Sequence, residues 1–293
     1  NKNLMRSRIN GIIQDSLYLA KTKTAKQTFI LFGSEMSVTG IGIVSAILNT
    51  RILGPKGYGI LAFFGTITGF TILFFRFGLF SSIGLLLAQE KDKKKERELI
   101  GISILIGLLV GVSYSLFIFI SSFFVDGIFK TNINHILRVF SPILLLLPFQ
   151  MLIPQIGRGT NKIKHLAWFN TIPKSLYVIG VISILLLGLT QIKVSTLILL
   201  NLITVIAGVI IISYAFKPLF FNLKKNLKKI WQKNKEYGIH LYWGQIADQS
   251  TYNLDGILIS YFVNTTQLGF YSLAGAITKP MAMLSRSVST SLF

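Results

Sequence analysis

Long, nearly uninterrupted runs of apolar residues dominate the chain. A helix that spans a bilayer needs about 20 mostly apolar residues, whereas a membrane barrel strand needs about 9–11 residues of alternating polarity. The apolar runs are too long for strands and do not alternate. Eight segments have the length and polarity of spanning helices: 28–48, 58–88, 99–125, 139–156, 166–190, 194–216, 237–263 and 268–293. The pattern predicts an all-α integral membrane protein, a transporter-like bundle with about eight transmembrane helices in this sequence.

Several of these segments contain residues that interrupt helices, among them 166–190 with Pro173 and Lys174. Segment 58–88 includes Arg76 and Gly78, which predict one long or broken helix with its break near Gly78. Segment 139–156 contains three prolines, which membrane helices tolerate because neighbouring groups satisfy the freed backbone. Glycines are frequent inside the segments, and we expect them to permit close packing between helices; examples are Gly40, Gly42, Gly65 and Gly69.

The composition agrees with a membrane protein. Apolar residues make up 52% of the chain and charged residues only 14%, whereas soluble domains carry about 25% charged residues. Disorder is excluded and a soluble domain is disfavoured. The absence of cysteine excludes disulfides and thiolate metal sites. No spacing of His, Asp and Glu indicates a metal site, and we expect no cofactor.

The positive charges follow the predicted topology. The chain has 30 Lys and Arg against 10 Asp and Glu, a net charge of +20. Loops on one side of the predicted membrane hold 21 of these basic residues, and loops on the other side hold 5. This bias predicts a multi-pass protein of the plasma membrane with a cytoplasmic N-terminus. Such basic loops favour contact with anionic lipids rather than nucleic acid.

A weak internal repeat suggests the domain organisation. Gly57 and Gly269 occupy similar turns 212 residues apart, and an acid followed by an arginine recurs at nearly the same offset. Because six helices separate the two copies, the repeat is parallel. The expected parts are a cytoplasmic N-terminal segment (1–26), a first six-helix lobe (27–216), a basic cytoplasmic linker (217–236) and the first two helices (237–293) of a second lobe. The chain stops within an apolar run, and we expect it to be a fragment of a longer protein.

Charged residues inside the predicted membrane segments are the candidate site, since such residues are rare and usually functional. Four are basic and form a possible cationic substrate path: Arg76, Lys174, Lys279 and Arg286. Three are acidic and are candidates for gating or charge pairs: Glu35, Asp248 and Asp255. Alternatives remain open. The two arginines and Lys279 could pair structurally with the acids, Lys174 could extend to the membrane surface, and the acids could bind a coupling ion.

Two stretches carry a resemblance to a known family. RILGPKGYGILAFF at 51–64 and DGILISYFVNTTQLGFYSLAGAITKPM at 255–281 resemble outer turns of the polysaccharide flippases, which belong to the multidrug/oligosaccharidyl-lipid/polysaccharide flippase superfamily. The resemblance implies two six-helix lobes around a central cavity that open alternately to the two sides. It also implies a cargo of oligosaccharide linked to a polyprenyl diphosphate, moved from the cytoplasmic to the outer leaflet.

Other functions stay open at this stage. A peptidoglycan-precursor flippase or a multidrug exporter would share the fold. The four basic residues against three acidic ones within the membrane favour an anionic cargo. A membrane glycosyltransferase, a polysaccharide polymerase or a non-transporting scaffold is disfavoured, and no nucleophile–base arrangement indicates an enzyme.

Overall fold

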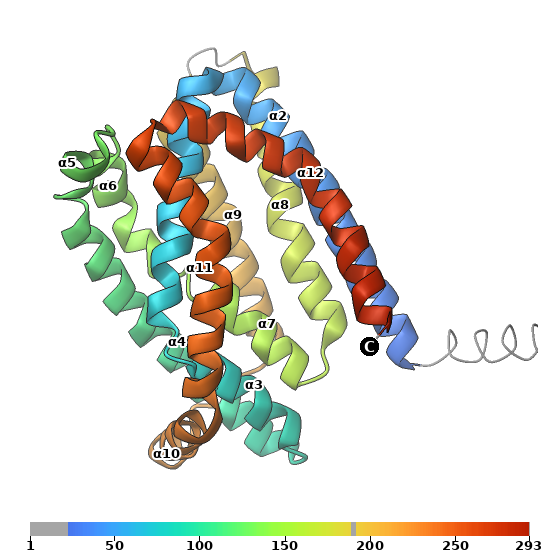
Figure 1. Cartoon of the computed structure of the whole chain (residues 1–293). Coiled ribbons are helices and arrows are strands. Elements are labelled where there is room, and N and C mark those ends of the chain that lie inside the picture. Colours follow the sequence, from blue (N-terminus) through green and yellow to red (C-terminus); the bar gives the residue numbers. More distant parts are fainter. Residues whose placement is uncertain (1–22, 189–191, 293) are drawn as a thin grey trace, which may run out of the picture.

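The first predicted segment and part of the second form one helical hairpin. The structure, a computed structural model, describes residues 23–188 and 192–292, and all regular structure within these ranges is helical. Helix α2 (Lys23–Thr71) reverses at Gly54, whose φ is 67°, and continues from Pro55. Glycine adopts this left-handed backbone without strain, and proline suits the first turn of a helix. Residues 23–53 and 55–71 are therefore two arms of the hairpin (Figure 1).

The second arm ends in the break predicted near Gly78. A short 3₁₀ helix, η1 (Ile72–Phe75), precedes a turn in which Phe77 and Gly78 have φ of 47° and 73°. The chain resumes in α3 (Leu79–Gln89) and continues through α4 (Lys93–Ser121) and α5 (Val125–Phe129). A helix break at this depth leaves backbone carbonyls that need partners from elsewhere.

The remaining predicted segments also become helices. Segment 139–156 is broken at Pro148, which separates α6 (Asn134–Leu144) from α7 (Phe149–Gly159). Then follow α8 (Ile163–Leu186), α9 (Val194–Ala215), α10 (Leu223–Lys233), the π-helical turn η2 (Asn234–Gly238), α11 (Ile239–Phe262) and α12 (Thr265–Leu292). Residues 1–22 of the predicted N-terminal segment lie outside the described residues.

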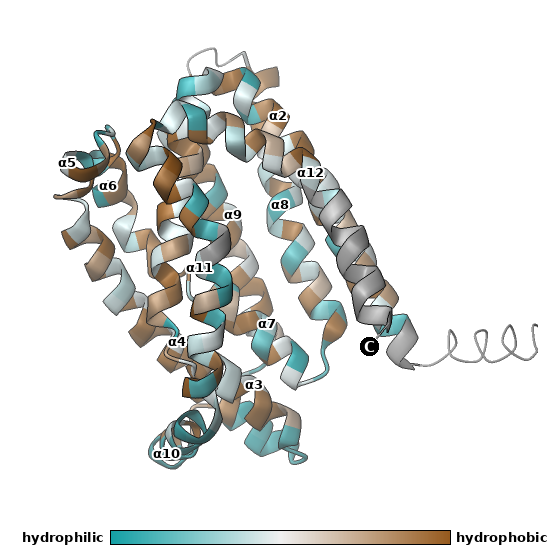
Figure 2. Cartoon of the chain, in the orientation of Figure 1, coloured by the Kyte–Doolittle hydropathy of each residue, from teal (hydrophilic) through white to brown (hydrophobic). Residues whose placement is uncertain are grey.

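The multi-helix membrane architecture is confirmed, but the count of eight spans is not. Within the described residues, five segments are long and apolar enough to cross a membrane: Lys26–Phe75, Lys93–Ser121, Asn134–Gly159, Ile163–Leu186 and Val194–Ala215. The first includes the hairpin, so it covers the first predicted segment and most of the second. Helices α11 and α12 are not among the five. Helix α11 carries polar residues such as Gln245, Asp248 and Asp255, and Figure 2 shows its mixed hydropathy beside the apolar α4 and α9.

The helices pack as one tall bundle. Helix α12 runs beside the first arm of α2, and α8 packs against α2 and α9 (Figure 1). Helix α3 packs on α7, and α4 on α6. One apolar core gathers around Ile83, Ile100 and Leu152, and a second around Phe63 and Tyr114. At the foot of the bundle α10 is seen nearly end-on, so it lies across the direction of the long helices.

The two stretches that carry the family resemblance meet at the top of the bundle. A Cβ built on Gly59 would come within 2.7 Å of the carbonyl carbon of Thr265, and one on Gly269 would come within 3.0 Å of the Gly59 Cα. The backbones of α2 and α12 therefore touch here, and no side chain fits between them. This contact fixes the start of α12 against the hairpin.

Gly59→Ala is expected to lower the stability of the protein by about 2 kcal/mol, since overpacking a tight contact typically costs about 1–3 kcal/mol. In a thermal unfolding experiment in detergent, the melting temperature should fall by about 5 °C. Gly65→Ala is the matched control, because it lies on the same helical arm and a Cβ there meets nothing within 4 Å. Equal melting temperatures for the two variants would contradict the contact.

Candidate functional site

A cavity of about 600 Å³ lies against both arms of the helical hairpin. Both arms of α2 line it, together with residues of η1, α6, α7, α8, α9 and α12 and of the turn before α7. Its size falls within the range of about 300–1,000 Å³ that is typical of ligand pockets.

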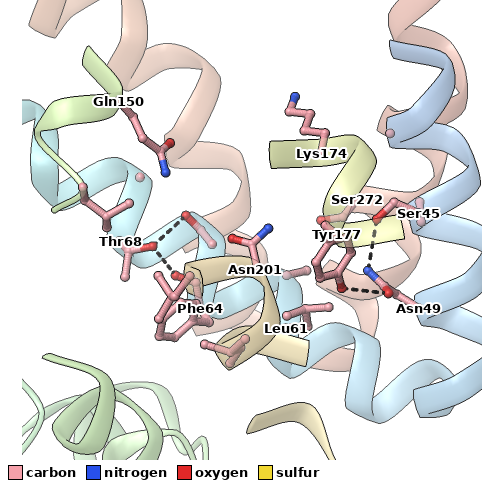
Figure 3. Close-up of a pocket in the computed structure, with 18 of the residues that line it drawn as sticks. Ser45, Asn49, Leu61, Phe64, Thr68, Gln150, Lys174, Tyr177, Asn201 and Ser272 are labelled. Carbon is pink, nitrogen blue, oxygen red and sulfur yellow. Dashed lines mark hydrogen bonds between the residues drawn. The ribbon is translucent and has the colours of Figure 1, made fainter. Parts of the chain in front are cut away.

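The wall of the cavity carries hydrogen-bonding groups on different helices. Tyr177 on α8 donates its hydroxyl to the Asn49 amide oxygen at 2.9 Å, and Asn49 donates to the Ser45 hydroxyl at 3.4 Å. Gln150 on α7 and Asn201 on α9 add two further amides. Figure 3 shows the Tyr177–Asn49–Ser45 chain on one side of the cavity. These groups can donate to and accept from a polar ligand.

A second cavity of about 390 Å³ adjoins the first. Three residues line both cavities: Gln150, Lys174 and Asn201. Glu35 on α2 and Asn170 on α8 line only the second. The shared residues make the two spaces neighbours along one polar path, and Lys174 lies at their junction. Its exposed side chain extends away from the Tyr177–Asn49 pair (Figure 3).

The expectation that helix glycines serve close packing is wrong for four residues of α2. A Cβ built on Gly40, Gly42, Gly65 or Gly69 would meet nothing within 4 Å. Three of them (Gly42, Gly65 and Gly69) line the larger cavity. The missing side chains keep this space open, so these glycines shape the cavity rather than a helix–helix contact.

Arg76 lies beside the cavity rather than in its wall. Its side chain is half-buried, and its Nε donates to the Met151 sulfur at 2.7 Å. Met151 itself lines the larger cavity. A thioether is a weak acceptor, and among the described residues no carboxylate forms an ion pair with Arg76.

The acidic candidates are dispersed. Glu35 is exposed and lines the smaller cavity with Lys174. Asp248 and Asp255 are exposed on α11, and Asp255 accepts a hydrogen bond of 2.8 Å from the Tyr271 hydroxyl. The side chains of Lys279 and Arg286, on α12, lie outside the described residues. The structure thus brings Glu35 and Lys174 to one cavity, with Arg76 behind the wall of the other.

The described part of the chain holds no group of three or more His, Asp or Glu residues that could bind a metal ion. The amides are the functional candidates that reasoning from charge missed. Asn49, Gln150, Asn170 and Asn201 lie on α2, α7, α8 and α9 and line one or both cavities. Each interrupts or borders an apolar segment. An uncharged polar residue within or beside an apolar segment could therefore have identified these candidates.

Comparison with known proteins places the chain in a family. A family model described as "Polysaccharide biosynthesis protein" matches residues 24–293. Comparison with curated proteins and with solved structures finds no match. The family match covers nearly the whole chain, including both stretches that resemble polysaccharide flippases and every helix that lines the cavities. The chain therefore belongs to the polysaccharide biosynthesis family of multi-pass, flippase-type membrane proteins.

Proposed function

We propose that this protein moves a polyprenyl-diphosphate-linked oligosaccharide across the plasma membrane, from the cytoplasmic to the outer leaflet, by alternating access. The family match supports a transporter of polysaccharide biosynthesis. The observation that carries the finer proposal is the position of Lys174 at the junction of two polar cavities within an apolar bundle. In this proposal the protein is a transporter and catalyses no covalent reaction.

The cargo must bring a charged diphosphate through a layer of hydrocarbon. Burying an unpaired charge is very costly, and a cationic partner with hydrogen-bond donors offsets that cost. Lys174 supplies one charge in the path, and Arg76 lies one side chain away behind Met151. In the proposed mechanism these two residues hold the diphosphate head while the polyprenyl tail remains in lipid. Lys279 and Arg286 would extend the same cationic path along α12.

The polar amides suit the sugar part of the cargo. Hydroxyl groups of a sugar both donate and accept hydrogen bonds, as do the side chains of Asn, Gln, Tyr and Ser. Gln150, Asn201 and the Tyr177–Asn49 pair face one cavity. An exporter of apolar cationic drugs would need an apolar, acidic cavity instead. The wall of this cavity therefore favours a neutral polar or anionic cargo over a cationic drug.

The proposal also assigns an orientation. The foot of the bundle, with α10 and the basic start of α4, would face the cytoplasm and anionic lipids, consistent with the positive-inside rule. The hairpin reversal at Gly54 would then face outward.

The same proposal includes gating by Glu35, Asp248 or Asp255 and the binding of a coupling ion at one of these acids. It also includes the arrangement of residues 27–216 and 237–293 in two related lobes.

Lys174→Gln is expected to cause lipid-linked oligosaccharide to accumulate in the cytoplasmic leaflet. The substitution keeps most of the side-chain length and removes the charge that would offset the diphosphate. The measurement compares the accessibility of the sugar to an impermeant probe in sealed, right-side-out vesicles from cells that express either form of the gene. Outer-leaflet sugar should fall by about tenfold, which corresponds to the loss of one charge-assisted contact.

Lys164→Gln is the matched control, since Lys164 lies on the same helix, is exposed and lines neither cavity. It should retain normal outer-leaflet sugar. Equal transport by the Lys174→Gln variant and the wild type would exclude a role for this charge. A failure to make the lipid-linked sugar at all, in cells that lack the protein, would indicate an enzyme instead.

A further inference from the structure

A crevice at the foot of the bundle has the composition of an anion site. It has a volume of about 600 Å³ and lies between the start of α4 and α10, remote from the two cavities described above. Its lining includes five lysines and three carboxylates: Lys94, Lys95, Lys225, Lys228, Lys229, Glu90, Asp92 and Glu98. The lining therefore carries a net positive charge.

The carboxylates are already engaged. Glu90 forms an ion pair with Lys229 at 3.2 Å, and Asp92 lies 3.8 Å from Lys95. Glu98 accepts a hydrogen bond of 3.0 Å from the Asn222 amide. Burial alone would raise the pKa of Glu90, but the hydrogen bond from Lys229 lowers it below its usual value. Glu90 therefore stays charged at neutral pH. Lys225 and Lys228 form no ion pair with a carboxylate of the described residues.

A buried donor gives the crevice a second anion-binding feature. Asn226 lines the crevice and is only 9% exposed. Among the described residues its Nδ2 has no hydrogen-bond partner. A buried donor without an acceptor costs about 1–3 kcal/mol, and a phosphate oxygen would supply that acceptor. Lys225, Asn226 and Lys228 all line the crevice, so one ligand bound there can reach all three.

The outer face of α10 indicates where the phosphate comes from. Leu227 and Trp231, one turn apart, are 46% and 53% exposed, and Phe220 and Phe221 just before the helix are also exposed. The adjacent face, about 100° round the helix, packs into the bundle through Asn226 and Ile230. Helices that lie in a membrane interface typically carry exposed apolar residues interleaved with lysines. Helix α10 has this composition and lies across the direction of the bundle.

We propose that the crevice between α4 and α10 binds the phosphate headgroup of an anionic phospholipid. Lys225 and Lys228 contact the phosphate, and Asn226 donates to one of its oxygens. Leu227 and Trp231 enter the boundary between headgroups and acyl chains beside it. The proposal depends on the placement of α10 at the membrane surface and not on the identity of the transported cargo.

The test uses the fluorescence of Trp231 in the full chain. Trp168→Phe and Trp243→Phe leave Trp231 as the only tryptophan of the chain. The protein is reconstituted in phosphatidylcholine vesicles with a minor fraction of lipid brominated on its acyl chains, either phosphatidylglycerol or phosphatidylcholine. Brominated phosphatidylglycerol is expected to quench Trp231 more strongly than the same fraction of brominated phosphatidylcholine.

Two double variants remove the same charge from different places. Lys225→Gln with Lys228→Gln should reduce the preference for phosphatidylglycerol about tenfold, given the usual contribution of lysines near an anionic surface. Lys224→Gln with Lys235→Gln, whose residues do not line the crevice, should leave most of the preference. Asn226→Asp replaces the donor by a carboxylate of the same shape. It should weaken the preference for phosphatidylglycerol although both lysines keep their charge.

Two results would overturn the proposal. Equal loss of preference in the two double variants would indicate diffuse attraction to the surface rather than a site. Absence of any preference for phosphatidylglycerol, together with a change in Trp231 emission on addition of inorganic phosphate to phosphatidylcholine vesicles, would assign the crevice to a soluble phosphate instead.

Discussion

Gly42→Leu is expected to stop transport while the protein remains folded. Gly42 lies on the first arm of α2 and lines the larger cavity, and a Cβ there meets nothing within 4 Å. The larger side chain therefore enters empty space and does not collide with a helix. It occupies volume beside Ser45 and Asn49, where the proposed cargo has to pass. An added side chain that a ligand must displace costs about 1–3 kcal/mol, so transport should fall about tenfold or more.

Gly40→Leu is the matched control for this variant. Gly40 lies two residues earlier on the same arm, and a Cβ there also meets nothing within 4 Å, but it does not line either cavity. Both variants should reach the membrane in equal amounts and melt at similar temperatures. The leaflet assay should separate them, with the lipid-linked sugar retained inside only for Gly42→Leu. Normal transport by both variants would show that the cargo does not use this cavity.

The helices could be predicted from the sequence because their length and polarity are one-dimensional properties. Apolar run length located α4, α8 and α9 to within a few residues, and Gly78 located the break in the second segment. The direction in which each side chain points could not be predicted in this way. Direction decided which residues face the cavities. Lys174 faces both cavities, whereas Arg76, predicted on the same grounds, lies behind Met151.

The glycines and the amides also show that residue type alone does not predict which residues line a cavity. A glycine in a membrane helix can admit a neighbouring backbone, as Gly59 does at Thr265, or leave space for a ligand, as Gly42 does. The residue type is identical, and only the packing of α12 and α8 around α2 distinguishes the two. The amides at Gln150 and Asn201 carry no charge, so a search for intramembrane charge passed over them. Burying an amide without a hydrogen-bond partner costs free energy. This cost was the physical signal that could have identified these two residues.

Asn234→Leu is expected to produce the largest loss of stability among the substitutions considered. Asn234 is 2% exposed. Its amide donates a hydrogen bond of 3.0 Å to the Phe77 carbonyl and accepts one of 3.2 Å from the Ser82 hydroxyl. Phe77 lies in the break between η1 and α3, where no helical partner is available for its carbonyl. The leucine is similar in size but leaves the Phe77 carbonyl without a partner and removes one hydrogen bond of Ser82, whose hydroxyl keeps only its bond to the Gly78 carbonyl. One buried carbonyl without a partner and one lost hydrogen bond cost together about 2–4 kcal/mol, so the melting temperature should fall by about 10 °C.

The position of Asn234 explains why this single amide has such a large effect. It lies in the π-helical turn that joins α10 to α11, and Gly238 of that turn packs directly on Gly78. Together with the hydrogen bond of 2.8 Å from the Tyr242 hydroxyl to the Phe74 carbonyl, these contacts attach the second part of the chain to the broken helix. Asn253→Leu on α11 is the control, since the Asn253 amide donates to the Gln249 carbonyl of its own helix and, among the described residues, forms no other side-chain hydrogen bond. If the two variants melt together, the break at Phe77 and Gly78 is stabilised by other contacts, and η2 is only a connection.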